Sequence, residues 1–411
     1  MTSHTDVQVS LSEDLYLLKR VQSSSCLPRY TFVNQQEFIL NTVALYMTTG
    51  RPDGVVATFF HESTFTLYLA KSGPPNHIDA AKATSFLSCL KDATGFEALL
   101  PFLALYSAEN VEKRIRNLFY SLEEILELLA EIAPEDENTA LESLKTLLEF
   151  PFTFDDTAEA HDKFINIIAA SSNLLKCFSS FQSAFPSKYA NVYLSRLKRH
   201  LTKVVQYRDA NRLIWFVQRN SSKITICWVP GTSQRQLSLT GTVVDRYLDG
   251  FLAWAIIDFD LNKKAQIREL MASALTYRDQ TIEVTVFVHP EIRLIMYLTD
   301  VVGVQSQYPP GTQLYIGSGK RICGCCEQWI DAFNNCVTVK WMATFLNHGM
   351  RYDWKIPDPD LTQHIQVAVR QGNDAVLKSV ERGMRDKLTR EYNYALDTLF
   401  DTWYRDRKYS H

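Results

Sequence analysis

Two short motifs contain side chains that could hold one metal ion together. The first is His289-Pro290-Glu291, and the second is the Cys-x-x-Cys pair formed by Cys323 and Cys326. One imidazole and two thiolates are three protein ligands for zinc, and such a set leaves the fourth tetrahedral position for water, as in catalytic zinc sites. Glu291 is left unligated, so it can accept and donate protons beside that position. The pattern therefore predicts Zn²⁺ at His289, Cys323 and Cys326, with Glu291 as the catalytic acid and base.

The first motif is predicted to lie where a strand meets a helix. Apolar residues alternate with other residues from Ile282 to Val288, which is typical of a strand. Pro290 suits the first position of a helix, where its missing N–H would have no partner anyway. Residues two apart in mid-helix point about 200° from each other. Only a helix start, with His289 as the cap residue, therefore lets His289 and Glu291 face one site.

The second motif is predicted to open another helix. Gly317-Ser318-Gly319 supplies the turn before it, and Cys323 and Cys326 are three residues apart, which makes them neighbours on one helix face. The positive end of the helix dipole favours thiolates in the first turn. Cys325 or Cys336 could instead supply a fourth ligand, which would close the site and make the zinc structural. Helical spacing points Cys325 away from its neighbours, and this favours the open site.

Composition and cysteine usage restrict the setting of such a site. Half of the eight cysteines lie between residues 323 and 336, which suits a metal site in a reducing compartment better than a disulfide framework. The formal net charge of −3 means that any contact with nucleic acid must come from a local patch. No apolar run is long enough to span a membrane, and the N-terminus lacks the features of a secretory signal. We therefore expect a cytoplasmic or nuclear protein with no membrane partner.

Residues from about 220 to 358 resemble the zinc-dependent deaminase superfamily, and within it the OTT_1508-like family of fungal and bacterial nucleic acid or nucleotide deaminases. The resemblance is carried by His289-Pro290-Glu291, by Tyr315–Lys320 leading into Cys323-Gly324-Cys325-Cys326, and by His348-Gly349 followed by Trp354-Lys355-Ile356-Pro357. It implies an α/β fold, a three-layer α/β/α cytidine-deaminase-like domain with a zinc ion. It also implies hydrolytic deamination of a base.

Some positions depart from the family pattern. Pro290 stands where Ala or Val is common, and Gly319 is an extra residue before the lysine. His348 and Trp354 are candidates for contact with the substrate, and Lys320 is a candidate for contact with a substrate phosphate. A packing role for Trp354 and a solvated position for Lys320 are the alternatives.

Helical regions are expected on both sides of this domain. Residues 1–219 should form a mostly helical N-terminal region with one short β-hairpin, Val55–Phe60 and Thr64–Leu69. Residues 220–358 should form the zinc domain, and residues 359–411 a C-terminal helical extension. The alternation of strands and helices in the zinc domain favours a mostly parallel sheet.

Three finer expectations concern segments between these elements. Residues 1 to about 30 have the pattern of a loose arm with one short helical stretch. Gly231–Ser238 has the composition of a turn-rich link, and Gly372-Asn373 is expected to break the C-terminal helix.

Residues 187–219 combine many basic side chains with aromatic ones and contain a single acid, Asp209. This mixture is typical of proteins that bind single-stranded nucleic acid, which place charges on phosphates and rings on bases. An amphipathic helix with buried aromatics and solvated basic residues has the same composition. The residues are Lys188, Arg196, Lys198, Arg199, Lys203, Arg208, Arg212 and Arg219, with Tyr193, Tyr207, Trp215 and Phe216.

Two functions remain open. The first is a zinc hydrolase that removes the exocyclic amine of cytosine or adenine, in a nucleotide or in single-stranded nucleic acid. The second is a non-catalytic module in which zinc stabilises the fold and the helical region binds a partner. A phosphate loop is excluded because Leu314 and Arg321 stand where a loop ending at Gly319-Lys320 needs Gly and Ser or Thr. The chain also lacks the Gly-x-Ser-x-Gly and His-Glu-x-x-His motifs of other hydrolases.

Overall fold

The computed structural model describes residues 4–19, 35–51, 54–132, 144–146, 148, 151–179, 188–220, 223–231, 234–239, 251, 261–275, 281–320, 322–343, 353–362 and 364–409. His348, one of the candidate substrate contacts, lies outside these residues.

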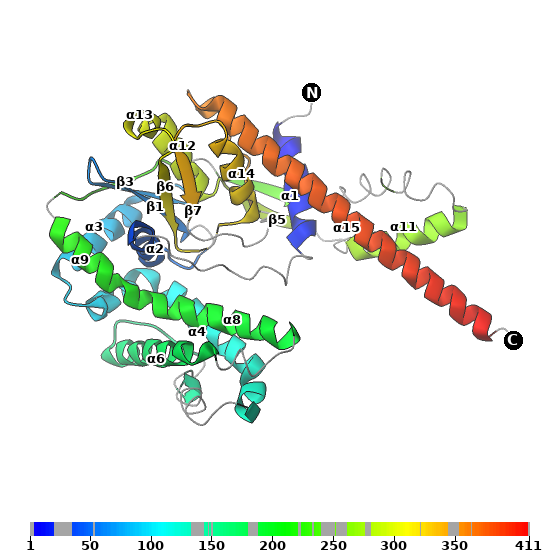
Figure 1. Ribbon diagram of the computed structural model, residues 1–411, viewed down its shortest axis with the longest axis horizontal. Coiled ribbons are helices and arrows are strands. Elements are labelled where there is room, and N and C mark those ends of the chain that lie inside the picture. Colours follow the sequence, from blue (N-terminus) through cyan, green and yellow to red (C-terminus); the bar gives the residue numbers. More distant parts are fainter. Residues whose placement is uncertain are drawn as a thin grey trace.

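A five-stranded mixed sheet forms the centre of the molecule (Figure 1), with the strand order β3-β2-β1-β6-β7. The strands are β1 (Val56–His61), β2 (Thr66–Lys71), β3 (Thr225–Trp228), β6 (Gln313–Ser318) and β7 (Lys340–Ala343). β1 and β2 form the expected antiparallel hairpin, and β1 also runs antiparallel to β6. The β2–β3 and β6–β7 pairs are parallel. The strand pattern of β1 therefore belongs to the same sheet as the strand that leads into the second motif.

Helices cover both faces of this sheet. Successive side chains of β1 point to opposite faces, and each set is buried against a different group of helices. Val56 and Phe60 lie in one hydrophobic cluster with residues of α2 (Gln35–Met47). Ala57 and Phe59 lie in a second cluster with residues of α12 (Pro290–Asp300), α14 (Gly324–Asn334) and α15 (Gln366–Tyr409). The protein thus has the expected three-layer α/β/α architecture, with the two motif-bearing helices α12 and α14 on one face.

A large helical region connects β2 to β3 and packs beyond α2. It consists mainly of α3 (His77–Asp92), η2 (Phe96–Leu99), α4 (Leu100–Ile132), α6 (Ala158–Lys176), α8 (Lys188–Val205), η3 (Gln206–Asp209) and α9 (Ala210–Asn220). Its apolar residues, such as Ile115, Leu118 and Leu122 of α4, are buried in the cluster that also contains α2. Residues on both sides of position 219 contribute strands to the central sheet, so the domain division at that position stays a prediction. Among the described residues, no helix combines the length and apolar character needed to cross a membrane.

The expectation of a loose N-terminal arm is wrong for residues 4–19. These residues form α1 (His4–Lys19), whose leucines are buried against α15, and Lys387 Nζ of α15 donates a hydrogen bond to Leu17 O at 2.9 Å. Polar residues of α1 such as Gln8 and Ser12 are buried as well. The helix is therefore covered on several sides, and it lacks the one-sided apolar stripe that identifies a surface helix in a sequence.

The expected turn-rich link at 231–238 is also wrong, because it contains β4 (Arg235–Leu239). β4 pairs antiparallel with β5 (Ile282–Val286) in a separate two-stranded sheet. Leu237 and Leu239 are buried there against Val284 and Val286. The strand before the first motif thus belongs to this small sheet and not to the central one. α11 (Leu261–Leu275) lies between β4 and β5 in sequence and packs on α15.

The C-terminal helix continues through Gly372-Asn373, so the expected break there is wrong. A Cβ atom on Gly372 would lie 2.5 Å from Trp329 Nε1, and that nitrogen donates a hydrogen bond to Asn373 Oδ1 at 3.1 Å. Gly372 is therefore the residue that lets α15 approach Trp329 of α14. Short elements α13 (Val304–Gln307) and η4 (Pro359–Leu361) complete the described structure.

Candidate metal centre and catalytic site

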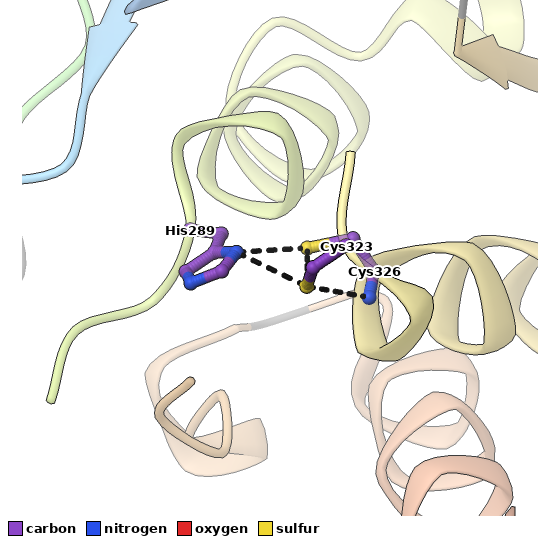
Figure 2. A group of neighbouring side chains, drawn as sticks. All are labelled: His289, Cys323 and Cys326. Atoms are coloured by element: carbon purple, nitrogen blue, oxygen red, sulfur yellow. Dashed lines mark hydrogen bonds between the residues drawn. The ribbon is translucent and has the colours of Figure 1, made fainter. Parts of the chain in front are cut away.

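Both motifs lie at helix starts, as their sequences predict. His289 is the N-cap of α12 with φ −60° and ψ 147°, and Pro290 is the first residue of the helix. Cys323 is the N-cap of α14 and accepts a hydrogen bond from Cys326 N at 3.5 Å. Because the cap residues are not helical, their side chains can turn toward each other across the space between the two helices. Figure 2 shows the imidazole of His289 facing both sulfur atoms.

The three side chains are close enough to share one ion. His289 Nδ1 lies 3.4 Å from Cys323 Sγ and 3.2 Å from Cys326 Sγ, and the two sulfur atoms are 3.5 Å apart. Tetrahedral zinc with ordinary bond lengths separates two sulfur ligands by roughly 3.8 Å and a sulfur from a nitrogen by roughly 3.6 Å. All three side chains are buried. This group of donor atoms therefore fits a zinc ion after shifts of a few tenths of an ångström.

Electrostatic coupling also prepares these groups for a cation. Burial lowers the pKa of His289, but the Cys323 thiolate and Asp353 outweigh it and raise that pKa to about 10. Burial raises the pKa of Cys323, but hydrogen bonds from Cys325 and Cys326 and the charge of His289 hold it well below its usual value. Burial and the adjacent Cys323 raise the pKa of Cys326 well above its usual value. A divalent cation binding here would displace protons from His289 and Cys326.

Glu291 lies beside this group and is held by a residue of β6. Ser318 Oγ donates a hydrogen bond to Glu291 Oε1 at 2.9 Å, and both residues are buried. Lys320 N donates to the same Ser318 Oγ at 3.4 Å, so the hydroxyl proton of Ser318 is directed toward the carboxylate. Burial raises the pKa of Glu291, against the charge of His289 and the bond from Ser318. A carboxyl group with a raised pKa can both accept and return a proton near neutral pH.

Ser318 is placed by close packing of β6 on α2. A Cβ atom on Gly317 would lie 2.4 Å from the carbonyl carbon of Leu40, and one on Gly319 would lie 2.7 Å from Thr48 Oγ1. Asn41 Oδ1 also accepts a hydrogen bond from Ser318 N at 3.0 Å. The sequence predicts Ser318 only as part of a turn. Its position between two glycines was the feature that could have indicated a functional side chain.

The helical region reaches the same loop. Arg114 of α4 donates from Nη2 to Gly319 O at 3.0 Å and from Nη1 to Lys203 O at 2.5 Å. Its guanidinium lies 5.4 Å from the centre of the Tyr207 ring, and the arginine is buried. The loop between β6 and Cys323 is therefore held both by α2 and by the helical region.

The remaining predicted residues lie in different surroundings. Trp354 is fully buried in the core, which agrees with the packing alternative, and it pairs with Phe287 in a parallel bridge. Lys320 is partly exposed on the loop after β6. Cys336 is exposed, and its thiol donates to Gln371 Oε1 at 2.7 Å.

A second acid near the metal group, Asp353, was not predicted from the sequence. Asp353 is buried, and its Oδ1 lies 3.5 Å from His289 Nε2, the ring nitrogen that faces away from the thiols. No motif includes this residue, although it directly precedes Trp354. In the described part of the chain, the group of possible metal ligands consists of His289, Cys323 and Cys326, without Cys325 or Cys336.

An α/β/α fold with a His-x-Glu and a Cys-x-x-Cys at two neighbouring helix starts defines a deaminase domain. Residues 288–358 match the family model of the OTT_1508-like deaminases. No curated protein and no solved structure matches the chain. The matched residues include both motifs, whereas α2, β1 and β2, which complete the sheet, precede the match by more than two hundred residues.

Proposed function

We propose that the protein is a zinc-dependent hydrolytic deaminase that acts on a nucleobase. The observation that carries this proposal is the relation of Glu291 to the metal group. The carboxylate lies two residues after the ligand His289 and is bound to Ser318 instead of joining His289, Cys323 and Cys326. A structural zinc site would need a fourth protein ligand. Three ligands with an unligated, buried acid beside them favour a catalytic site.

The residues of the site divide the chemistry between them. Zinc held by His289, Cys323 and Cys326 would lower the pKa of a bound water toward neutrality and so supply the nucleophile. Ser318 holds Oε1 of Glu291, which leaves Oε2 for the proton of the attacking water. Glu291 would pass that proton to the ring nitrogen of the base. It would then move the second proton, from the hydroxyl group added to the ring carbon, to the amine, so that the C–N bond breaks, a carbonyl group forms and ammonia departs. Burial of Glu291 keeps bulk water from competing for the proton.

Substitution of the acid separates catalysis from metal binding. Glu291→Gln should retain zinc, measured by elemental analysis, because Glu291 is not a ligand. The variant should lose at least about 100-fold in deamination, the usual contribution of an acid–base residue. The substrates to screen are cytosine and adenine as free base, nucleoside, nucleotide, single-stranded DNA and single-stranded RNA. Glu381→Gln, on the exposed surface of α15, is the matched control. Undiminished activity of Glu291→Gln would refute the mechanism.

The competing function is a binding module with a structural zinc ion. It predicts bound zinc without deamination of any substrate in the screen, and loss of fold when Cys323 is replaced by Ser. The catalytic proposal predicts ammonia release by the wild-type protein with at least one of these substrates.

A row of exposed residues on η3 and α9 favours single-stranded nucleic acid as the form of the substrate. Arg208 of η3 and Arg212, Trp215 and Arg219 of α9 are spaced by four, three and four residues and are all exposed, so they lie on one side of this helical stretch. The Arg219 guanidinium lies 3.7 Å from the centre of the Trp215 ring. Exposed cations beside an exposed indole are suited to phosphates and a stacked base.

Four other members of the basic and aromatic stretch have structural roles. Tyr207 is fully buried, Tyr193 and Phe216 pack against the core, and Arg196 forms an ion pair with Glu124 at 2.7 Å. The amphipathic-helix alternative thus accounts for these residues. A recess lined by Gln206, Asp209 and Ser318, among others, lies beside the N-terminal end of the exposed row. It brings the row near the residue that holds Glu291.

Salt dependence of binding tests this substrate form without any turnover. Glu291→Gln protein and a fluorescent single-stranded oligonucleotide should give an affinity that falls as salt rises. Replacing Arg212 and Arg219 by Ala should flatten the slope of log affinity against log salt by roughly 1.4, if each contacts one phosphate. The paired control replaces Arg382 and Arg390, which are exposed on α15. Equal slopes for both double variants would exclude the α9 row as the binding face.

A further inference from the structure

We propose that Asp353 is a positioning residue for the zinc ligand His289, and that helix α1 holds Asp353 in its place. This inference rests on the zinc site proposed above. His289 directs Nδ1 to the two thiols, and its other nitrogen, Nε2, faces Asp353 Oδ1 at 3.5 Å. Both side chains are buried. In the described part of the chain, Nε2 has no hydrogen bond of regular geometry, and Asp353 lies within ion-pair distance of it.

The chemistry of imidazole gives this contact a function. A neutral imidazole carries one proton, so Nδ1 can donate its lone pair to a metal only when the proton is on Nε2. A carboxylate at Nε2 accepts that proton, fixes this tautomer and the ring orientation, and makes Nδ1 a stronger donor. Asp353 is the buried carboxylate in that position. Its carboxylate faces the imidazole of His289, so its effect on the metal group passes through that ring.

Two sets of hydrogen bonds hold the segment that carries Asp353. On one side, Phe287 N donates to Asp353 O at 3.1 Å, and Lys355 N donates to Phe287 O at 3.0 Å. This ties the segment to the residues just before His289, so that ligand and carboxylate lie on two neighbouring segments joined at the Phe287–Trp354 bridge. The distance between the His289 ring and Asp353 is therefore set by backbone pairing and not by two flexible loops.

On the other side, a single side chain of α1 binds the segment twice. Gln8 Nε2 donates to Trp354 O at 3.0 Å, and Gln8 Oε1 accepts from Ile356 N at 2.8 Å. Gln8 is 1% exposed, so both bonds are shielded from water. The Gln8 side-chain amide thus binds the backbone groups of Trp354 and Ile356 as a neighbouring strand would. Helix α1 thereby supports the segment that faces a ligand nearly three hundred residues later in the chain.

Zinc affinity measured by chelator competition tests the inference without an activity assay. Asp353→Asn keeps the shape but removes the negative charge, and it should weaken zinc binding by about 10 to 100-fold, the usual effect of losing such a partner. Asp353→Glu keeps the charge and should bind zinc more tightly than Asp353→Asn. Asp360→Asn is the matched control, because Asp360 lies in the same segment and its side chain is 78% exposed. It should bind zinc as the wild type does.

Gln8→Leu tests the support from α1. It removes both bonds to residues 354–356 and should weaken zinc binding while leaving all ligands and Asp353 in the chain. Cobalt spectra of each variant identify the ligand set, and an unchanged spectrum with lower affinity distinguishes positioning from loss of a ligand.

The outcomes separate this inference from the proposed function. A wild-type protein that binds no zinc overturns both. A wild-type protein that binds zinc tightly, together with a folded Asp353→Asn variant within twofold of it, overturns the role of Asp353 alone. If Asp353→Asn does not fold, equal zinc affinity of Asp353→Glu, Gln8→Leu and the wild type overturns the inference instead.

Discussion

Replacing Arg293 should loosen the attachment of β2 and β3, the strands on either side of the helical region, to helix α12. Arg293 lies on α12, one position before Leu294 and two after Glu291, and it is 3% exposed. Its guanidinium donates to Lys71 O and to Gly73 O at 3.0 Å, where the chain leaves β2. It also donates to the carbonyl oxygens of the two residues that follow β3, at 3.2 and 2.7 Å. One side chain therefore binds the segments that follow β2 and β3, the two strands that the helical region connects.

The size of the effect follows from these four bonds. Burial lowers the pKa of Arg293 to about 10, so its charge is retained because the carbonyl groups solvate it. Arg293→Met keeps most of the apolar stem but removes every donor, which leaves four carbonyl groups short of a partner. Breaking a buried charged network of this kind costs about 3 to 5 kcal/mol in the free energy of unfolding. Arg293→Lys keeps the charge without the planar fork and should cost roughly half as much.

Chemical denaturation of the zinc-loaded protein measures this cost. Unfolding by guanidinium is followed by circular dichroism and by tryptophan fluorescence, because Trp228 lies on β3 and Trp329 on α14. Arg385→Met is the control, since the Arg385 side chain is 73% exposed and pairs with Glu381 in the same helix. That change should cost at most about 0.5 kcal/mol. If Arg293→Met were within 1 kcal/mol of Arg385→Met, roughly the value of one ordinary hydrogen bond, the proposed attachment would be wrong.

Three further changes probe the site and its surroundings. Ser318→Ala should reduce turnover about 10 to 100-fold with unchanged zinc content, because it removes one hydrogen bond to the charged Glu291 worth ~1.5 to 3 kcal/mol. Ser318→Thr keeps a hydroxyl group and should retain more activity. Full activity of the alanine variant would contradict this role. Gly317→Ala should lower the melting temperature, since its Cβ would meet the Leu40 carbonyl carbon at 2.4 Å, and an unchanged value would show that β6 can move away from α2. Burial, and to a smaller extent the neighbouring cations, lower the pKa of His200 to about 3. Between that pH and about 6.5, the unfolded chain binds a proton that the folded protein does not bind. The free energy of unfolding therefore falls as pH falls, by up to ~1.4 kcal/mol per pH unit. His200→Leu should therefore lose about 2 kcal/mol less than the wild type between pH 7 and 5 in parallel denaturation curves, and coinciding losses would refute the assignment.

Local sequence was sufficient for the elements that carry the motifs. The alternation from Ile282 to Val288 and the position of Pro290 predicted a strand followed by a helix start, and β5 and α12 have that arrangement. The turn before Cys323 and the start of α14 agree in the same way. These features depend on backbone geometry within a few residues, so neighbouring side chains are enough to specify them.

Long-range contacts decided the features that sequence reasoning missed. Helix α1 has no one-sided apolar stripe because it is covered on several sides. Gly372 lies within an unbroken helix at the position where a Cβ atom would collide with the Trp329 side chain. The two strands of the hairpin could be predicted, but not that they pair with β6 and β3, since pairing partners lie far apart in the chain. A glycine or a polar residue has one local preference, and its tertiary neighbours can override it.

The sequence by itself determined the candidate metal ligands, one histidine and two cysteines, and an acid beside them in an order typical of deaminases. Tertiary structure alone decided that the donors converge within 4.8 Å of one another, that Ser318 holds Glu291, and that Asp353 faces His289. The identity of a ligand is a property of one residue. Its distance and orientation depend on where segments from opposite ends of the chain pack together, which only the folded structure specifies.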